Sequence, residues 1–397
     1  MASACFLSML IASRIVLGLG TGVLLAIIPL WQSENSPAKK RGAHVGMKGI
    51  FSGLGCALSL FLDFGMSFTR RSASWRFPFA FVMLLSLAVL VFIVHLPESP
   101  RWLLREERIS EASEVLAALG DTSVDDESVK SQVKDVQMSL DLAGKKSLGQ
   151  IFHMGPQRTF HRAMLALTVM LLMQLTGSTV ITFYTTGIFE QNLHLGNSTS
   201  TILAAVYQLV GPLGGIFCVL KIKGLGRRVL LLGSAIGNTV CLALVAASEP
   251  RHIAQSQCVV RYIIGFGAIP YLYAIEITPL HLRTTINSFS TSSSWAISIL
   301  ITLVTPLAFN SMGQTYFVIF AGSNALMVPI IYYFFPETAG RSLEEMDKIF
   351  ALSKGVRDSV RAAQLLPCGQ DTELLSEKDL GPNFKCPELQ LREIHSA

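Results

Sequence analysis

Nine runs of apolar residues dominate the chain, and each is long enough to cross a lipid bilayer. They cover roughly residues 5–31, 45–66, 77–96, 161–188, 201–220, 229–248, 258–276, 284–309 and 315–335. A helix needs about 20 such residues to span ~30 Å of hydrocarbon, where its backbone polar groups must bond to one another. Only 15% of the 397 residues are charged, against about 25% in soluble domains. The sequence therefore predicts an all-α polytopic protein embedded in a lipid bilayer.

The remaining charged residues indicate how the chain is oriented. Lys and Arg gather in alternate loops, at 39–41, 101–108 and 221–228. Cytoplasmic loops carry an excess of these residues, so we expect these loops and the C-terminus in the cytoplasm. The arginines at 70–76 fall on the other side, so this orientation rests on the majority of the loops. The net charge of +5 then reflects membrane topology, and nucleic acid is not an expected partner.

Two segments repeat one pattern at a fixed distance. WQSENSPAKKRG at 31–42 and YAIEITPLHLRT at 273–284 share E-x-x-P-x-x-x-R, with an offset of 242 residues. A second pair, LPESPRWL and FPETAGRSL, follows two runs after each copy. Such repeats are typical of transporters whose halves rock about a site at the bilayer midplane. Within the second half, which begins near residue 161, three runs precede 258–276, but none precedes its counterpart at 5–31, so symmetry predicts three further helices before Met1.

The repeat divides the chain into four expected regions. Residues 1–104 form a partial N-terminal helical bundle of three spans, and residues 161–349 form a C-terminal bundle of six. The polar segment 105–160 is expected to be a cytoplasmic linker with short surface helices. The tail at 350–397 is polar and contains proline, so we expect it to be cytoplasmic and disordered.

Six motifs occur in order along residues 5–350. They are RIVLGLGTG, PLWQSENSPAKKRG, PESPRWLL, GLGRR, GFGAIPYLYAIEITPLHLR and PETAGRSLEEMD. Together they resemble the sugar porter branch of the major facilitator superfamily, in its fungal form. The resemblance implies a major facilitator fold of twelve helices, of which this chain has about nine and lacks the first three. It also implies alternating access for a sugar or a sugar-like solute such as a polyol, with coupling to protons and a location in the plasma membrane.

The same resemblance implies a gate at the inner ends of the helices. Acidic and basic residues of the repeated motifs are expected to form an ion-pair network that holds the two halves together while the cavity opens outward. The alternative is that these charges only stabilise loop ends and topology. The expected members are Glu34, Arg41, Glu98, Arg101, Arg227, Arg228, Glu276, Arg283, Glu337 and Arg341.

The resemblance also implies which residues line the substrate cavity, and here the chain departs from the family pattern. Family members bind sugar hydroxyls with amide side chains, because an amide both donates and accepts hydrogen bonds. Several of these amides are replaced, so we expect either a different substrate (a polyol, an aromatic or alicyclic acid, a glycoside) or a degenerate paralogue. The expected lining residues are Gln174, Thr179, Tyr184, Tyr271 and Trp295, with ordinary helix packing as the alternative for the aromatic ones.

Arg14 lies inside the first apolar run, where a guanidinium is costly without an anion or water. No acidic residue occurs between Met1 and Trp31. The resemblance implies that Arg14 couples transport to protons by pairing with a carboxylate on the family's first helix. That helix would precede Met1.

No other chemistry is indicated by the sequence. A Walker A pattern is absent, so an ATP-driven pump is not expected, and the scattered His and Cys residues predict no metal site. We expect no cofactor and no enzymatic activity. Two alternatives to transport stay open: a nutrient sensor that signals without transport, and an inactive paralogue truncated at its N-terminus.

Overall fold

The computed structural model describes residues 5–69, 72–143, 148–152, 158–193, 196–247, 265–267, 269–280, 282–341, 343–353, 355 and 358–365. Within these ranges the regular structure is entirely helical, with no strand. Eight helical segments are long and apolar enough to cross a membrane. The seventh predicted run, 258–276, is described only at 265–267 and from residue 269 on, where its end forms α13 (Ile269–Ile277). The all-α fold class is therefore confirmed.

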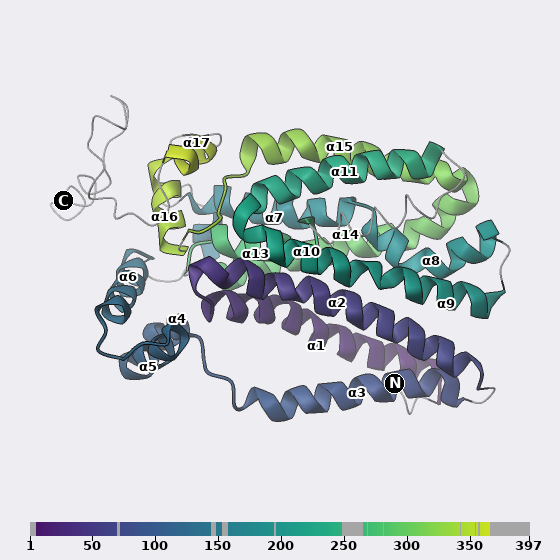
Figure 1. Ribbon diagram of the computed structural model, residues 1–397, viewed down its shortest axis with the longest axis horizontal. Helices are drawn as coiled ribbons and strands as arrows, with labels where there is room; N and C mark the ends of the chain where they lie inside the picture. Colours follow the sequence, from purple (N-terminus) through teal and green to yellow (C-terminus); the bar gives the residue numbers. More distant parts are fainter. Residues whose placement is uncertain are drawn as a thin grey trace.

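The first half consists of three long helices. They are α1 (Leu7–Glu34), α2 (Ala38–Ser67) and α3 (Ala73–Ile93). Figure 1 shows α1 and α2 lying side by side, with α3 along the outside. No residue of α3 is buried, and its exposed leucines, valines and phenylalanines give it the surface of a helix that faces hydrocarbon.

A group of short helices covers one end of the bundle, which we call the capped end (Figure 1). It contains α4 (Pro100–Arg105), α5 (Ile109–Gly120), α6 (Glu127–Ala143) and, from the C-terminal side, α16 (Leu343–Leu352) and α17 (Asp358–Leu365). The first three share a small core around Leu103, Leu104 and Ala112. A short 3₁₀ turn, η1 (Leu148–Phe152), leads into the second half.

The expectation of a disordered tail does not hold for residues 358–365. They form α17 because its small apolar residues, Ala362 and Ala363, pack into the main core. Arg341 also donates a hydrogen bond to the carbonyl of Ala363. The rest of the predicted tail, 366–397, lies outside the described residues.

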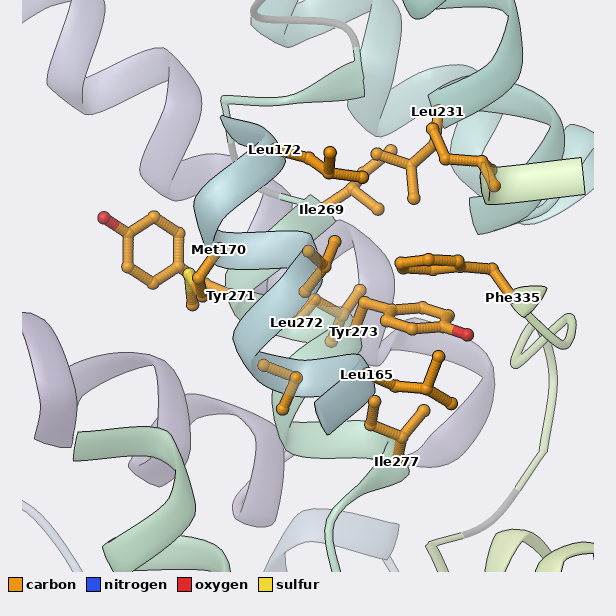
Figure 2. Packing of buried hydrophobic residues seen from close by; sticks show 14 of the residues in the cluster. Leu165, Met170, Leu172, Leu231, Ile269, Tyr271, Leu272, Tyr273, Ile277 and Phe335 are labelled. Atoms are coloured by element: carbon orange, nitrogen blue, oxygen red, sulfur yellow. The ribbon is translucent and has the colours of Figure 1, made fainter. Parts of the chain in front are cut away.

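The second half forms the larger bundle. It comprises α7 (Thr159–Leu175), α8 (Ser178–Leu193), α9 (Asn197–Gln208), α10 (Val210–Leu225), α11 (Arg227–Ala247), α13, α14 (Arg283–Met312) and α15 (Tyr316–Phe334), with a 3₁₀ turn, η2 (Gly313–Thr315), before α15. Its core joins α7, α11, α13 and α15. Figure 2 shows this packing, in which the ring of Tyr273 stacks on that of Phe335 with centroids 5.2 Å apart.

One of the predicted spans, 161–188, is broken into α7 and α8 at Gly177. This glycine has φ +80°, and a Cβ there would lie 2.7 Å from Cγ of Phe320. Only glycine adopts such a conformation without strain and leaves room for the neighbouring ring. The break places Gln174 and Thr179 on either side of it, and interrupted helices of this kind line solute sites in transporters.

The two halves meet closely along α2 and α10. A Cβ on Gly53 would lie 2.8 Å from the Pro212 ring, and one on Gly215 would lie 2.8 Å from the Ile50 side chain. Small residues let helix backbones approach in this way within a membrane. The contact between halves therefore depends on glycine at both helices.

Candidate functional site

An ion pair joins the two halves at the capped end. Arg283 Nη1, at the start of α14, lies 3.4 Å from Glu34 Oε1, at the end of α1. The other oxygen of Glu34 accepts a 2.5 Å hydrogen bond from Ser99 Oγ. Both charged side chains are largely buried, with exposed fractions of 2% for Arg283 and 10% for Glu34. The glutamate of the first motif copy is thus bonded to the arginine of the second copy.

Arg41 makes the second link between the halves. Its Nε donates to the carbonyl of Ser33 at 3.0 Å, and its Nη1 donates to the carbonyl of Arg341 at 3.4 Å. The side chain is buried. The guanidinium therefore holds backbone from both halves, because its planar group presents five donors in a fixed arrangement.

Glu276 is the most deeply buried carboxylate of the predicted network. Its Oε1 lies 2.9 Å from Arg227 Nη2, and its Oε2 accepts from Thr338 Oγ1 at 2.6 Å. The exposed fractions of the two charged side chains are 1% and 4%. The free-energy cost of removing an ion pair from water is offset only when its polar atoms are hydrogen-bonded, and both carboxylate oxygens of Glu276 are hydrogen-bonded here.

Glu337 caps the N-terminus of α11. Its Oε1 accepts from the Arg227 amide at 2.8 Å, and its Oε2 accepts from the Arg228 amide at 3.0 Å. A carboxylate suits this position because the first amides of a helix have no partner within it. Gly226 has φ +80°, and a Cβ there would lie 2.5 Å from Glu337 Oε2, so the cap requires glycine.

The structure brings the remaining predicted gate residues to the same end. Arg101 Nη1 donates to the Glu34 carbonyl at 3.4 Å, and Arg228 lies over the Tyr332 ring at 5.1 Å. Glu98 is exposed, and its charge, after that of Glu111, raises the pKa of Arg108. Nine of the ten residues therefore contact one another or the neighbouring backbone, and Glu98 stands at the edge.

A second polar cluster lies at the break between α7 and α8. Gln174 Nε2 donates to Ser294 Oγ of α14, and Gln174 Oε1 accepts from Thr179 Oγ1, each at 2.9 Å. Gln174 and Ser294 are buried. The amide thus bridges three helices, with one donor and one acceptor already in use. One amide hydrogen and one lone pair remain for other partners.

The predicted aromatic residues occupy three different environments. Tyr184 is partly buried against a second core, which joins α8, α11, α14 and α15, and its hydroxyl donates to the Thr302 carbonyl at 2.9 Å. Trp295 is 41% exposed on α14. Tyr271 is buried on α13, and Lys48 Nζ of α2 lies 2.9 Å from the centre of its ring.

Arg14 is exposed on α1, and its guanidinium lies 5.0 Å from the centre of the Phe79 ring of α3. This cation–π contact is the interaction that the structure shows for the Arg14 side chain among the described residues. No carboxylate among those residues forms an ion pair with it.

A family model described as sugar (and other) transporter matches residues 1–350. The chain belongs to this family. The resemblance inferred from the six motifs is thereby confirmed.

Fungal relatives agree with this family assignment. The chain is 34% identical over 356 residues to the sugar transporter STL1 of Saccharomyces cerevisiae, covering 87% of this chain and 63% of that one. It is 30% identical over 352 residues to the major facilitator superfamily transporter mfsA of Aspergillus fumigatus, covering 86% and 65%. The chain thus spans less than two thirds of the length of these relatives.

The fold matches a solved transporter. The proton:xylose symporter XylE, bound to 6-bromo-6-deoxy-D-glucose, aligns with a TM-score of 0.77 at 19% identity, covering 85% of this chain and 73% of that one. XylE is a protein of the major facilitator superfamily, so the match confirms that this chain has the predicted fold. With its apolar helices, the family member described here is an integral membrane protein.

Two features of this transporter-family chain were missed by sequence reasoning. Arg162 at the start of α7 is fully buried and pairs with Asp347 of α16 at 2.5 Å, which ties the C-terminal helices to the bundle. Lys48 was overlooked because it lies near the end of an apolar run, where a lysine is common. No group of three His, Cys, Asp or Glu suited to a metal ion occurs in the part of the chain that the structure describes.

Proposed function

We propose that the chain moves a sugar or sugar-like solute across the plasma membrane by alternating access, with protons as the co-substrate and the capped end in the cytoplasm. STL1 is named a sugar transporter and XylE a proton:xylose symporter. The observation that carries the proposal is the Glu34–Arg283 ion pair, because it joins the two halves that must separate. Alternating access requires two states, and such contacts are formed in one state and broken in the other.

The capped end acts as the inner gate. In the present arrangement Glu34 holds Arg283 across the halves, and Arg41 holds the backbone at Arg341. Opening toward the cytoplasm breaks both links, so their strength sets the balance between the two states. Glu276 and Glu337 work differently, because their partners lie within the second half. They keep that half rigid while it moves.

The solute lies at the broken helix and its neighbours. Gln174 and Thr179 supply polar contacts there, and Trp295 and Tyr271 supply aromatic faces against which a sugar ring packs. The hydroxyl of Tyr184 is bonded to backbone, which favours helix packing for this residue. Arg14 is the coupling residue, since it is a cation within the first span that forms no ion pair among the described residues.

Uptake into liposomes tests the proposal. With three helices of a family transporter added before Met1, the purified chain should accumulate a labelled sugar or polyol, faster with an inward proton gradient, and Arg14→Gln should abolish the effect of the gradient. Absence of uptake for every sugar and polyol, with correctly folded protein, would refute transport and favour the sensor reading.

The gate has its own test. Ser290 is buried on α14, about two turns beyond Arg283, so Ser290→Cys reports inner opening through its rate of modification by a thiol reagent added at the capped end. Glu34→Gln should speed modification, and the exchanged pair Glu34→Arg with Arg283→Glu should slow it again. The chain without the added cysteine sets the background. Equal rates in all of these variants would contradict the gate.

A further inference from the structure

Lys48 is a cation placed within the apolar length of α2. It lies about 10 Å along the helix axis from Arg41, at ~1.5 Å per residue. Its Nζ is buried and makes no hydrogen bond among the described residues. The ring of Tyr271, 2.9 Å away, is the partner that the structure gives it. A cation–π contact offsets only part of the cost of an ammonium group at this depth.

Among the residues that the structure describes, no carboxylate near α2 is free to neutralise Lys48. The helices packed against α2 are α1, α3, α9, α10 and α13. Together with α2 itself, their described residues include three acidic side chains: Glu34, Asp63 and Glu276. Glu34 is bonded to Arg283 and Ser99, and Glu276 is bonded to Arg227 and Thr338. Asp63 lies 15 residues farther along α2, about 22 Å away.

The position of Tyr271 relates Lys48 to the polar cluster. Figure 2 shows the Tyr271 ring on the opposite side of α13 from Tyr273, whose ring packs on Phe335. On this side α13 faces α2, and α13 also packs against α7, which carries Gln174. Tyr271 therefore lies on a helix that contacts both α2, which carries the ammonium, and α7, which supplies polar contacts of the site.

We propose that Lys48 binds the carboxylate of an anionic sugar-like solute, a sugar acid, while the Tyr271 ring packs against the solute's apolar face. This inference rests on the proposed transport of sugar-like solutes. An ammonium group gives a carboxylate a charge-assisted hydrogen bond, which is roughly twice as strong as one between neutral groups. This hydrogen bond compensates for the cavity-lining amides of the family that are replaced in this chain. The carboxylate of the solute is the counter-ion that Lys48 lacks among the described residues.

Two probes of nearly equal shape isolate the charge. D-Glucuronate carries a carboxylate where D-glucuronamide carries a neutral amide. Binding of each, labelled, to the purified 397-residue chain is measured by equilibrium dialysis. The chain should bind glucuronate about tenfold or more tightly than glucuronamide, the size expected for a hydrogen bond to a charged group.

Substitutions assign that preference to Lys48. Lys48→Gln should remove the tenfold preference, so that glucuronate binds no more tightly than glucuronamide, and a circular dichroism spectrum like that of the parent shows that the variant is folded. Lys48→Arg should retain most of the preference. Lys221→Gln, which removes an exposed lysine of α10, is the matched control and should behave as the parent does.

The outcomes separate this inference from the proposed function. If both probes bind equally to the parent, or if Lys48→Gln keeps the preference, the assignment of Lys48 is overturned while transport of neutral solutes stands. If neither probe nor any neutral sugar binds, the proposed function and the inference fail together.

Discussion

The basic residues of the capped end and those of the membrane-spanning helices find different partners. At the capped end Arg227 and Arg283 each face a carboxylate whose second oxygen is also hydrogen-bonded. Within the spans, the only partners that Arg14 and Lys48 have among the described residues are the rings of Phe79 and Tyr271. Both settings remove charge from water, but only the first supplies full compensation.

This difference indicates what each region does. A network whose members satisfy one another holds one arrangement of helices, and changing that arrangement has a defined cost. A cation that meets only an aromatic ring keeps hydrogen-bonding capacity for a ligand or a proton-linked partner. The capped end is therefore suited to hold a state, and the spans are suited to recognise a solute.

The largest expected effect is at Glu276. Glu276→Gln leaves Arg227 buried without a counter-charge, so the free energy of unfolding should fall by about 3–5 kcal/mol. Denaturant titration in detergent, followed by circular dichroism, measures this loss.

An exposed pair provides the control for this variant. Glu111 hydrogen-bonds to Arg108 at the surface of the linker helices and raises its pKa. Glu111→Gln should leave the unfolding curve unchanged, because exposed ion pairs contribute little. A similar loss in both variants would show that burial does not set the contribution of an ion pair to stability here.

The sequence alone identified the charged residues of the capped end but not their pairing. The repeat E-x-x-P-x-x-x-R located Glu34, Arg41, Glu276 and Arg283, because charges beside apolar runs stand out at a constant offset. That Glu34 contacts Arg283 follows from how α1 and α14 approach in space, and that Glu276 contacts Arg227 follows from how α13 and α11 approach. Sequence spacing carries no information about such contacts between distant segments.

The middle of the spans could be predicted less well. Gln174 and Thr179 were predicted from the resemblance to the family, because their segment matches the family segment that carries amide side chains. Their mutual hydrogen bond depends on the left-handed turn at Gly177, which a glycine within a run suggests but does not require. Tyr184 and Trp295 look alike in the sequence, yet one is packed against backbone and the other is 41% exposed.

The next effect concerns the broken helix. Gly177→Ala places a Cβ against the Phe320 ring and a side chain in a left-handed conformation, so unfolding should become easier by about 2–3 kcal/mol. Thermal unfolding in detergent measures this loss of stability. Phe320→Leu in the same chain should recover only the part due to the clash. If Gly177→Ala alone is neutral, the turn does not hold Gln174 and Thr179 in place.

The smallest effect is expected where an aromatic ring is the partner of Arg14. Arg14→Gln and Phe79→Leu, made singly and together, form a double-mutant cycle whose coupling energy should be about 0.5–1 kcal/mol, the value of an exposed cation–π contact. The free energy of unfolding in detergent is measured for all four chains. The same cycle on Arg227 and Glu276 should give a coupling several times larger, because that pair is buried and fully hydrogen-bonded. Equal coupling energies at the two sites would mean that Phe79 stabilises the charge of Arg14 as fully as Glu276 stabilises that of Arg227. Arg14 would then not be available for proton coupling.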